Sequence, residues 1–160
     1  LQSRQIAAYK GIMAFILKNH SKDFISGRDM DFTVYKDDSV DIHHVFPRDY
    51  CEKQDYPKAK WNSIINKTPL SSSTNREVGG VAPSKYLERI ESKGEVAPSV
   101  LDSYLESHWL DVTYCRRDDF DKFIIDRAGK LLDAIEVAMD KKISGRDSED
   151  VLKEFGDILC

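Results

Sequence analysis

Apolar residues recur every three or four positions near both ends of this chain, and that period breaks down between them. The spacing predicts an amphipathic helix over 3–18, a longer one from about Asp118 to Lys141, and a last one that carries Val151 to Leu159. Between them, β-branched and aromatic residues from Val40 to Phe46 predict a short strand. A mainly helical body therefore surrounds a small insert with strand character.

The insert is expected to hold a second strand and a short helix. Ser63 to Thr68 is the strand candidate, ended by Pro69, and Ser71 to Thr74 then supply side chains of the kind that cap helix N-termini. Gly79–Gly80 is expected to stop this helix. Further helices are expected to begin at two prolines, Pro83 and Pro98.

Length and composition fit a single domain. The 160 residues contain 41% apolar and 32% charged side chains, enough apolar surface to close a core and too much charge for a membrane span. The predicted fold class is α+β, with a strand–strand–helix insert over about 40–92 enclosed by a helical body of 1–39 and 93–160. Three widely spaced cysteines argue against a disulfide framework and favour a reducing, cytoplasmic location (Cys51, Cys115, Cys160).

Only the insert gathers side chains suited to catalysis. His43 and His44 stand together shortly before Pro47, and Asn66 and Asn75 follow. Neighbours on a strand point to opposite faces, so a strand end or bulge is needed if one imidazole is to bind a metal while the other faces substrate. Asparagine offers an amide oxygen to a hard cation, which suits Asn75 as a ligand and Asn66 as a positioning group.

This order of residues resembles the HNH, or ββα-metal, endonucleases. In that family a metal ligand directly precedes a general-base histidine in a motif that ends in proline, as His43–His44–Val45–Phe46–Pro47 does. An asparagine of the second strand and an asparagine or histidine of the short helix follow, matched by Asn66 and Asn75. Two departures are that many members carry aspartate where this chain has His43, and that the zinc-binding cysteine pairs of some members are missing. The resemblance implies a metal-dependent DNA endonuclease built on a ββα-metal finger.

The resemblance also implies a task for each residue. His44 would accept a proton from the attacking water, and Asn66 would hold its ring in place. His43 and Asn75 would bind one divalent ion, with Mg²⁺ as the first expectation and Mn²⁺ or another transition ion as alternatives. Asp41 would orient His43 or reach the metal through water.

The flanking residues resemble a particular group of these enzymes, the C-terminal nuclease half of GmrSD-like bacterial restriction and phage-defence proteins. The similarity is carried by 24–27, 66–70, 74–76, 79–80 and 83–87, and by the helix that holds Phe120, Phe123 and Arg127. It implies DNA as the substrate and an N-terminal ParB-like nucleotidase domain in a longer chain, which the absent initiator methionine also favours. A monomer and a homodimer both stay open, and no membrane association is expected.

The net charge of −4 argues against a protein held on nucleic acid by bulk charge. Its distribution is uneven, since residues 44–93 carry 9 Lys and Arg against 6 Asp and Glu, whereas the rest of the chain carries 15 against 22. The segment 44–93, which covers most of the insert, is therefore mildly basic. Lys67 and Arg76 are the best candidates for phosphate contacts, with solvated surface charge as the alternative.

Other polar residues have plainer explanations. His20 and His108 are expected to be structural or exposed, Asn62 to be a turn or cap residue, and Cys51 to be a packing residue. Ser71 to Thr74 are expected to cap a helix, because no base stands beside them in the motif. Two other functions stay open: a nuclease-like module that binds nucleic acid or a partner without cutting, and a protein-interaction domain built from the terminal helices.

Overall fold

The computed structural model describes residues 2–31, 40–94 and 96–155. This part of the chain combines many helices with a small antiparallel sheet, so the α+β class predicted from the sequence is confirmed. In chain order the elements are α1 (Gln2–Lys18), β1 (Val40–His44), α3 (Arg48–Lys53), α4 (Lys58–Trp61), the 3₁₀ turn η1 (Ile64–Asn66), β2 (Lys67–Ser71), α5 (Ser72–Val78), α6 (Pro83–Ser92), α7 (Pro98–Glu106), α8 (Val112–Arg116), α9 (Phe120–Met139) and α10 (Glu149–Phe155).

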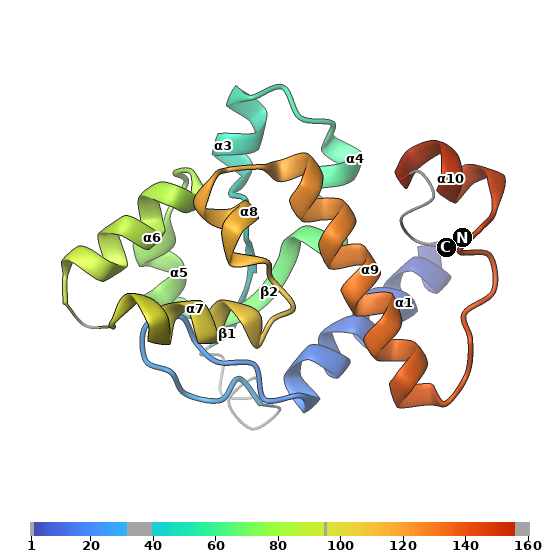
Figure 1. Cartoon of the computed structure of the whole chain (residues 1–160), viewed down its shortest axis with the longest axis horizontal. Coiled ribbons are helices and arrows are strands. Elements are labelled where there is room, and N and C mark those ends of the chain that lie inside the picture. The colour runs from blue at the N-terminus through green and yellow to red at the C-terminus, as the bar shows by residue number, and fades with distance from the viewer. Residues whose placement is uncertain (1, 32–39, 95, 156–160) are drawn as a thin grey trace.

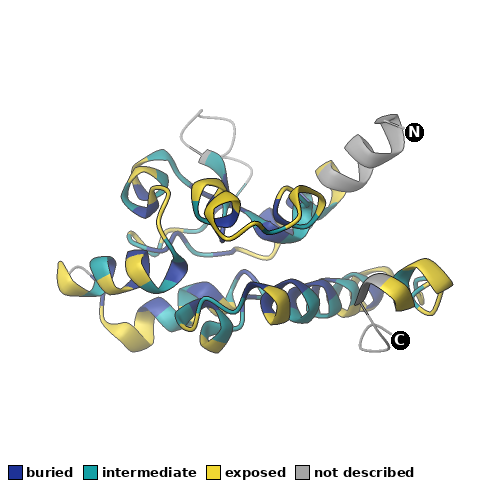
Figure 2. Ribbon diagram, turned by 90° about the horizontal axis from the view of Figure 1, so that it is seen from above, coloured by how far each residue is buried: buried dark blue, intermediate teal, exposed yellow. Residues whose placement is uncertain are grey.

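The two strands lie between groups of helices (Figure 1). α5 contacts both strands, α1 contacts β2, and α9 contacts η1. α3 and α4, which belong to the connection between the strands, extend beyond one end of the sheet in the same view. Buried residues line the inner faces where these elements meet, and exposed residues occupy the outer turns of the helices (Figure 2).

The second strand differs from its prediction. It is Lys67–Ser71 rather than Ser63–Thr68, and the sequence Ile64–Asn66 forms a 3₁₀ turn before it. Pro69 lies within the strand, opposite Ile42, instead of ending it. A proline is tolerated there because each strand of this described two-stranded sheet has one edge that pairs with no other strand, where no N–H donor is needed.

The helices α3 and α4 have no counterpart in the sequence prediction. Each begins directly after a proline, Pro47 and Pro57 respectively, and they contain only 6 and 4 residues. An apolar period cannot be read from so short a run. They nevertheless contribute to the core, since Cys51 and Trp61 are buried.

Helix α5 begins and ends as predicted. The Ser71 side chain accepts a hydrogen bond from the Thr74 N–H at 3.2 Å, which is the N-cap arrangement. At the other end Gly79 has φ of +58° and donates its N–H to the Asn75 carbonyl at 3.1 Å. Glycine adopts this conformation without the steric penalty that other residues incur. These two contacts fix the length of the helix that carries Asn75.

The later helices also follow the expected pattern. α9 occupies Phe120–Met139, close to the predicted Asp118–Lys141, and the Asp119 side chain caps it by accepting from the Lys122 N–H at 3.3 Å. α10 covers Glu149–Phe155, and the predicted continuation to Leu159 lies outside the described residues. No helix in the described ranges is both long enough and apolar enough to cross a membrane.

One hydrophobic core joins the insert to the helical body. Phe46, directly after β1, packs against Phe120 and Phe123 of α9 with ring centroids 5.3 and 4.7 Å apart. Tyr86 of α6 is fully buried and donates its hydroxyl to the Val45 carbonyl at 3.0 Å. Burying an aromatic side chain of this size contributes about 1.5–3 kcal/mol. The end of β1 is therefore held by α6 within the insert and by α9 of the helical body.

The cysteines of the described chain are structural. Cys51 and Cys115 are free and buried, and burial raises the pKa of each thiol to about 12. A thiol with so high a pKa holds its proton at neutral pH and is a poor nucleophile. The prediction of Cys51 as a packing residue is confirmed, and Cys160 lies outside the described residues.

Candidate functional site

A polar pocket of about 270 Å³ lies at the end of β1, where the strand, α3 and the C-terminal end of α5 meet. Both adjacent histidines reach it, because His44 is the last residue of the strand and the chain then leaves the sheet. The strand end that the sequence analysis required is thus present. The lining residues are His43, His44, Pro47, Arg48, Asp49, Asn75, Gly79 and Gly80.

His43 is buried and holds an unused ring nitrogen. The residue is only 6% exposed, and its Nε2 atom has no hydrogen-bond partner. Burial lowers the pKa of His43 to about 4, although a hydrogen bond with the Asn75 side chain opposes the shift. The imidazole is therefore neutral at pH 7, and a neutral imidazole is the form that binds a metal ion. A buried polar atom without a partner is uncommon in folded proteins and suits a ligand position.

Asn75 is held by the neighbouring strand. Its Nδ2 donates to Oδ2 of Asp41 at 3.0 Å, so the amide nitrogen is committed to the carboxylate. This leaves the amide oxygen as the group available to His43 or to a cation. Asp41 was predicted to orient His43 or to reach the metal through water, whereas its direct contact is with Asn75.

His44 is half-buried and contacts Asn62, which was predicted to be a turn or cap residue. Its Nε2 lies 3.3 Å from Oδ1 of Asn62, and its ring meets Trp61 edge to face at 5.8 Å between centroids. Because an amide oxygen only accepts hydrogen bonds, the Nε2 atom carries the hydrogen and Nδ1 has the free lone pair. Burial lowers the pKa of His44, and the positive charges of Lys67 and Arg48 lower it further, against the Asn62 contact.

Asn66 does not reach the imidazole of His44. Its side chain is fully buried, accepts from the Phe46 N–H at 2.8 Å, and donates to the carbonyls of Phe46 and Trp61 at 2.9 and 2.8 Å. It therefore holds the two ends of the 45–66 connection together rather than a ring in the pocket. Asn62 makes the contact that was expected of Asn66, and a turn residue with an exposed side chain carries no sequence signal for such a contact.

The two residues predicted to contact phosphate, Lys67 and Arg76, lie in different places relative to the pocket. Lys67 lies opposite His44 in the sheet, and burial lowers its pKa. Arg76 is exposed on α5 and does not line the pocket. Arg48, which the sequence analysis did not single out, does line it.

A residue of the helical body forms hydrogen bonds with the end of β2 and the start of α5. Asp23 accepts from the Ser71 N–H at 2.9 Å and from the Thr74 hydroxyl at 2.7 Å, so it holds the junction of β2 and α5. Burial alone would raise the pKa of Asp23, but the hydrogen bonds from Thr74, Ser26 and Ser71 lower it below its usual value. The arrangement of strand and helix is thereby tied to the segment that follows α1.

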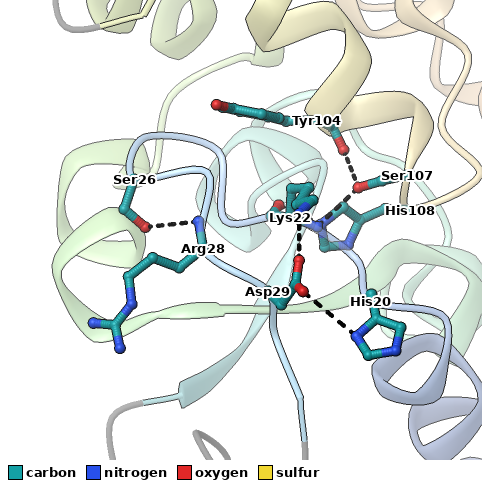
Figure 3. A network of polar contacts seen from close by, with 8 residues as sticks. All are labelled: His20, Lys22, Ser26, Arg28, Asp29, Tyr104, Ser107 and His108. Atoms are coloured by element: carbon teal, nitrogen blue, oxygen red, sulfur yellow. Dashed lines mark hydrogen bonds and ion pairs between the residues drawn. The ribbon is translucent and has the colours of Figure 1, made fainter.

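His108 connects that same segment to β2. It is fully buried, its Nδ1 is hydrogen-bonded to the Thr68 hydroxyl, and its Nε2 lies 2.7 Å from the Lys22 carbonyl. Figure 3 shows the surrounding contacts, in which the Lys22 N–H donates to Ser107 and the Lys22 ammonium and His20 both meet Asp29. His108 is thus a structural residue and His20 an exposed one, as the sequence analysis expected.

Two side chains at the pocket carry atoms of the kind that bind divalent ions. No group of three or more His, Cys, Asp or Glu side chains within residues 2–31, 40–94 and 96–155 is placed to hold a metal. The candidate ligands are instead one histidine and one asparagine, the unpartnered Nε2 of His43 and the amide oxygen of Asn75, beside the same pocket. Water and substrate oxygens would fill the other positions, as hard divalent ions commonly allow.

Comparison with known proteins adds little about activity. No family model matches the chain. An uncharacterized protein of Methanocaldococcus jannaschii is 26% identical over 123 residues, an alignment that covers 69% of this chain and 20% of that protein. The chain thus spans about a fifth of the length of this relative. No solved structure matches.

Proposed function

We propose that this protein is a metal-dependent endonuclease of the HNH type that hydrolyses DNA phosphodiester bonds. The observation that carries the proposal is the meeting of His43, His44 and Asn75 in one pocket, with the Nε2 atom of His43 buried and unpartnered. The order strand, connection, strand and helix around this pocket supports the ββα-metal finger that the sequence resemblance implies.

In this proposal His44 is the general base. Its lowered pKa keeps the ring neutral at pH 7, and the contact of Nε2 with Asn62 leaves Nδ1 to take a proton from the attacking water. Asn62 is a positioning residue that fixes the tautomer and orientation of the ring. Since Trp61 packs against the same ring, the imidazole has little freedom to rotate.

His43 and Asn75 are the proposed ligands of one divalent ion, Mg²⁺ or Mn²⁺. Such an ion, when bound, would supply Lewis-acid stabilisation of the charge that develops on the phosphate and the leaving oxygen. Asp41 would aim the amide oxygen of Asn75 into the site by holding its nitrogen. Asn66 supports the site by fixing the backbone that follows β1.

The biological setting that we propose, bacterial restriction or defence against phage, rests on the sequence resemblance alone. The same holds for the proposed ParB-like nucleotidase domain on the N-terminal side. A plasmid prepared with and without base modifications would test this setting, because a restriction enzyme directed at modified DNA should cut only one of the two.

The activity itself is tested by nicking of a supercoiled plasmid with Mg²⁺, with Mn²⁺ and with EDTA. We expect nicking only with a divalent ion and a loss of at least about 100-fold in His44→Ala, in line with the usual contribution of a general base. His20→Ala is the matched control, since His20 is exposed and lies outside the pocket. DNA retention without cleavage in any divalent ion would instead favour a binding module, and full activity of His44→Ala would reject the assigned base.

A further inference from the structure

Arg48 is the only Lys or Arg side chain among the described residues that line the pocket. It stands at the first position of α3, directly after Pro47, which ends the histidine motif. Arg48 therefore carries the positive charge that the lining of this pocket offers to an anion.

The guanidinium of Arg48 is anchored at one edge only. Its Nε donates to Oε1 of Glu52 at 2.8 Å, one turn further along α3. Neither terminal amino group has a hydrogen-bond partner among the described residues, and the Arg48 side chain is 65% exposed. A planar fork with two free donors matches the spacing of two phosphate oxygens. Glu52 thus fixes the plane of the group and leaves its binding edge open.

A second cation approaches His44 from another element. Lys67 lies opposite His44 in the sheet, whereas Arg48 comes from α3, and the charges of both act on the His44 ring. An exposed Arg–Glu pair on a helix is usually worth little by itself. Arg48 differs from Lys85 in its position, because Arg48 lies beside the proposed general base. Lys85 forms a similar exposed pair with Glu88 on α6.

We propose that Arg48 binds the backbone phosphate of a nucleic-acid strand through its two terminal amino groups, with Glu52 as the residue that positions the fork. This inference rests on the proposed function, which supplies the phosphodiester as ligand. Contacts of this kind place the strand without reading its bases, so Arg48 contributes affinity independent of sequence.

The test measures binding apart from cleavage. A fluorescein-labelled DNA duplex is titrated at several salt concentrations with the full chain carrying His44→Ala, followed by fluorescence anisotropy. Adding Arg48→Ala should weaken binding by about tenfold and reduce the slope of log K against log salt by about one. Arg48→Lys should keep most of the slope and lose part of the affinity, because the ammonium has the charge without the fork. Lys85→Ala should change affinity by less than about twofold.

The outcomes separate this inference from the proposed function. If Arg48→Ala behaves like Lys85→Ala, or if the chain shows no DNA binding at low salt, the inference is overturned even where plasmid nicking is observed. If Arg48→Ala weakens binding and lowers the salt slope while no divalent ion supports nicking, the phosphate contact stands and the nuclease proposal fails. Glu52→Gln should give an intermediate loss of affinity with an unchanged slope, and a loss of slope would contradict the positioning task.

Discussion

The carboxamide of Asn66 forms two hydrogen bonds with the backbone of Phe46: its Oδ1 accepts from the N–H at 2.8 Å, and its Nδ2 donates to the carbonyl at 2.9 Å. The same Nδ2 also donates to the Trp61 carbonyl at 2.8 Å. One side chain thus satisfies three buried backbone groups at both ends of the 45–66 connection. Asn62, four residues earlier, makes the contact with His44.

The different contacts of Asn62 and Asn66 lead to the first prediction. Asn66→Ala should lower the free energy of unfolding by at least about 2 kcal/mol, because buried backbone groups lose their partners. Asn62→Ala should change it by no more than about 0.5 kcal/mol, since the Asn62 side chain is exposed. Urea unfolding measures both. A stable Asn66→Ala variant that has lost nicking would instead show that Asn66 takes part in the reaction.

Asn62→Ala should act on the reaction through His44. Without the Asn62 oxygen, the tautomer with the hydrogen on Nε2 is no longer favoured, so the fraction of rings with a free Nδ1 falls. We expect kcat to fall several-fold with little change in KM, and the acidic limb of the pH profile of kcat/KM to move, because the hydrogen bond that favours the charged ring is gone. An unchanged pH profile would contradict the positioning task of Asn62.

A third prediction concerns the contact between Asp41 and Asn75. Asp41→Ala frees the Asn75 amide to rotate, so Mn²⁺ affinity should fall by about 10–100-fold, the usual cost of removing a group that orients a ligand. Isothermal titration with Mn²⁺ measures this without any assay of cleavage. Asp55→Asn is the control, because Asp55 is exposed with φ of +56°, a conformation that asparagine adopts well. Equal Mn²⁺ affinity of both variants would show that Asp41 does not contribute to metal binding.

The parts of the site that the sequence could predict are those with a fixed spacing along the chain. His43, His44 and Asn75 meet in the pocket as the motif order indicated, and the cap at Ser71 and the stop at Gly79 follow from local chemistry. The end of the second strand could not be predicted correctly, because Pro69 signals a strand end unless the strand is known to lie at an edge.

Contacts between distant segments left no comparable signal. In the sequence, Arg48 and Asn62 are indistinguishable from ordinary surface or turn residues, and only the fold places them beside His44. Asp23 is separated from Thr74 by 51 positions, so a carboxylate in a turn gave no indication that it holds the junction of β2 and α5. Only the packing of the body against the sheet defines these tasks.

The stability of the protein should depend on pH through His108. Burial lowers its pKa in the folded state from the ordinary 6.5 to about 3, with the charge of Arg127 adding to the shift and Asp23 opposing it. Below pH 6.5 the unfolded chain therefore binds a proton at this residue that the folded chain does not bind. The contribution of His108 to the free energy of unfolding is fully present above pH 6.5 and is lost as the pH falls. Urea unfolding should show a loss of about 1.4 kcal/mol per pH unit from this residue between pH 6 and 4.

Replacing the histidine isolates that contribution. His108→Gln should reduce the slope of stability against pH by about one proton over the same range, whatever its effect on stability at pH 7. His20→Gln, at an exposed position, should leave the slope as it is. Equal slopes for the parent chain and His108→Gln would show that His108 titrates normally in the folded state.

Arg127 provides the last prediction, since it is a fully buried guanidinium that contacts carbonyls. Its Nε donates to the His108 carbonyl at 3.2 Å, and its Nη1 donates to the carbonyls of Ile65 and Lys67, which flank Asn66. Burial lowers the pKa of Arg127 to about 9, and its Nη2 atom has no partner. The side chain therefore holds the turn before β2 at the cost of burying a charge.

Both Arg127→Lys and Arg127→Met should destabilise the protein, and comparing them separates charge from hydrogen bonding. Lysine keeps the charge but not the fork, so at least one of the three carbonyls is left without a donor. Methionine removes the buried charge and all three bonds. We expect each variant to lose about 2–5 kcal/mol in urea unfolding, because unsatisfied buried groups outweigh the relief of the charge. A methionine variant more stable than the parent would show that the buried charge costs more than its contacts return.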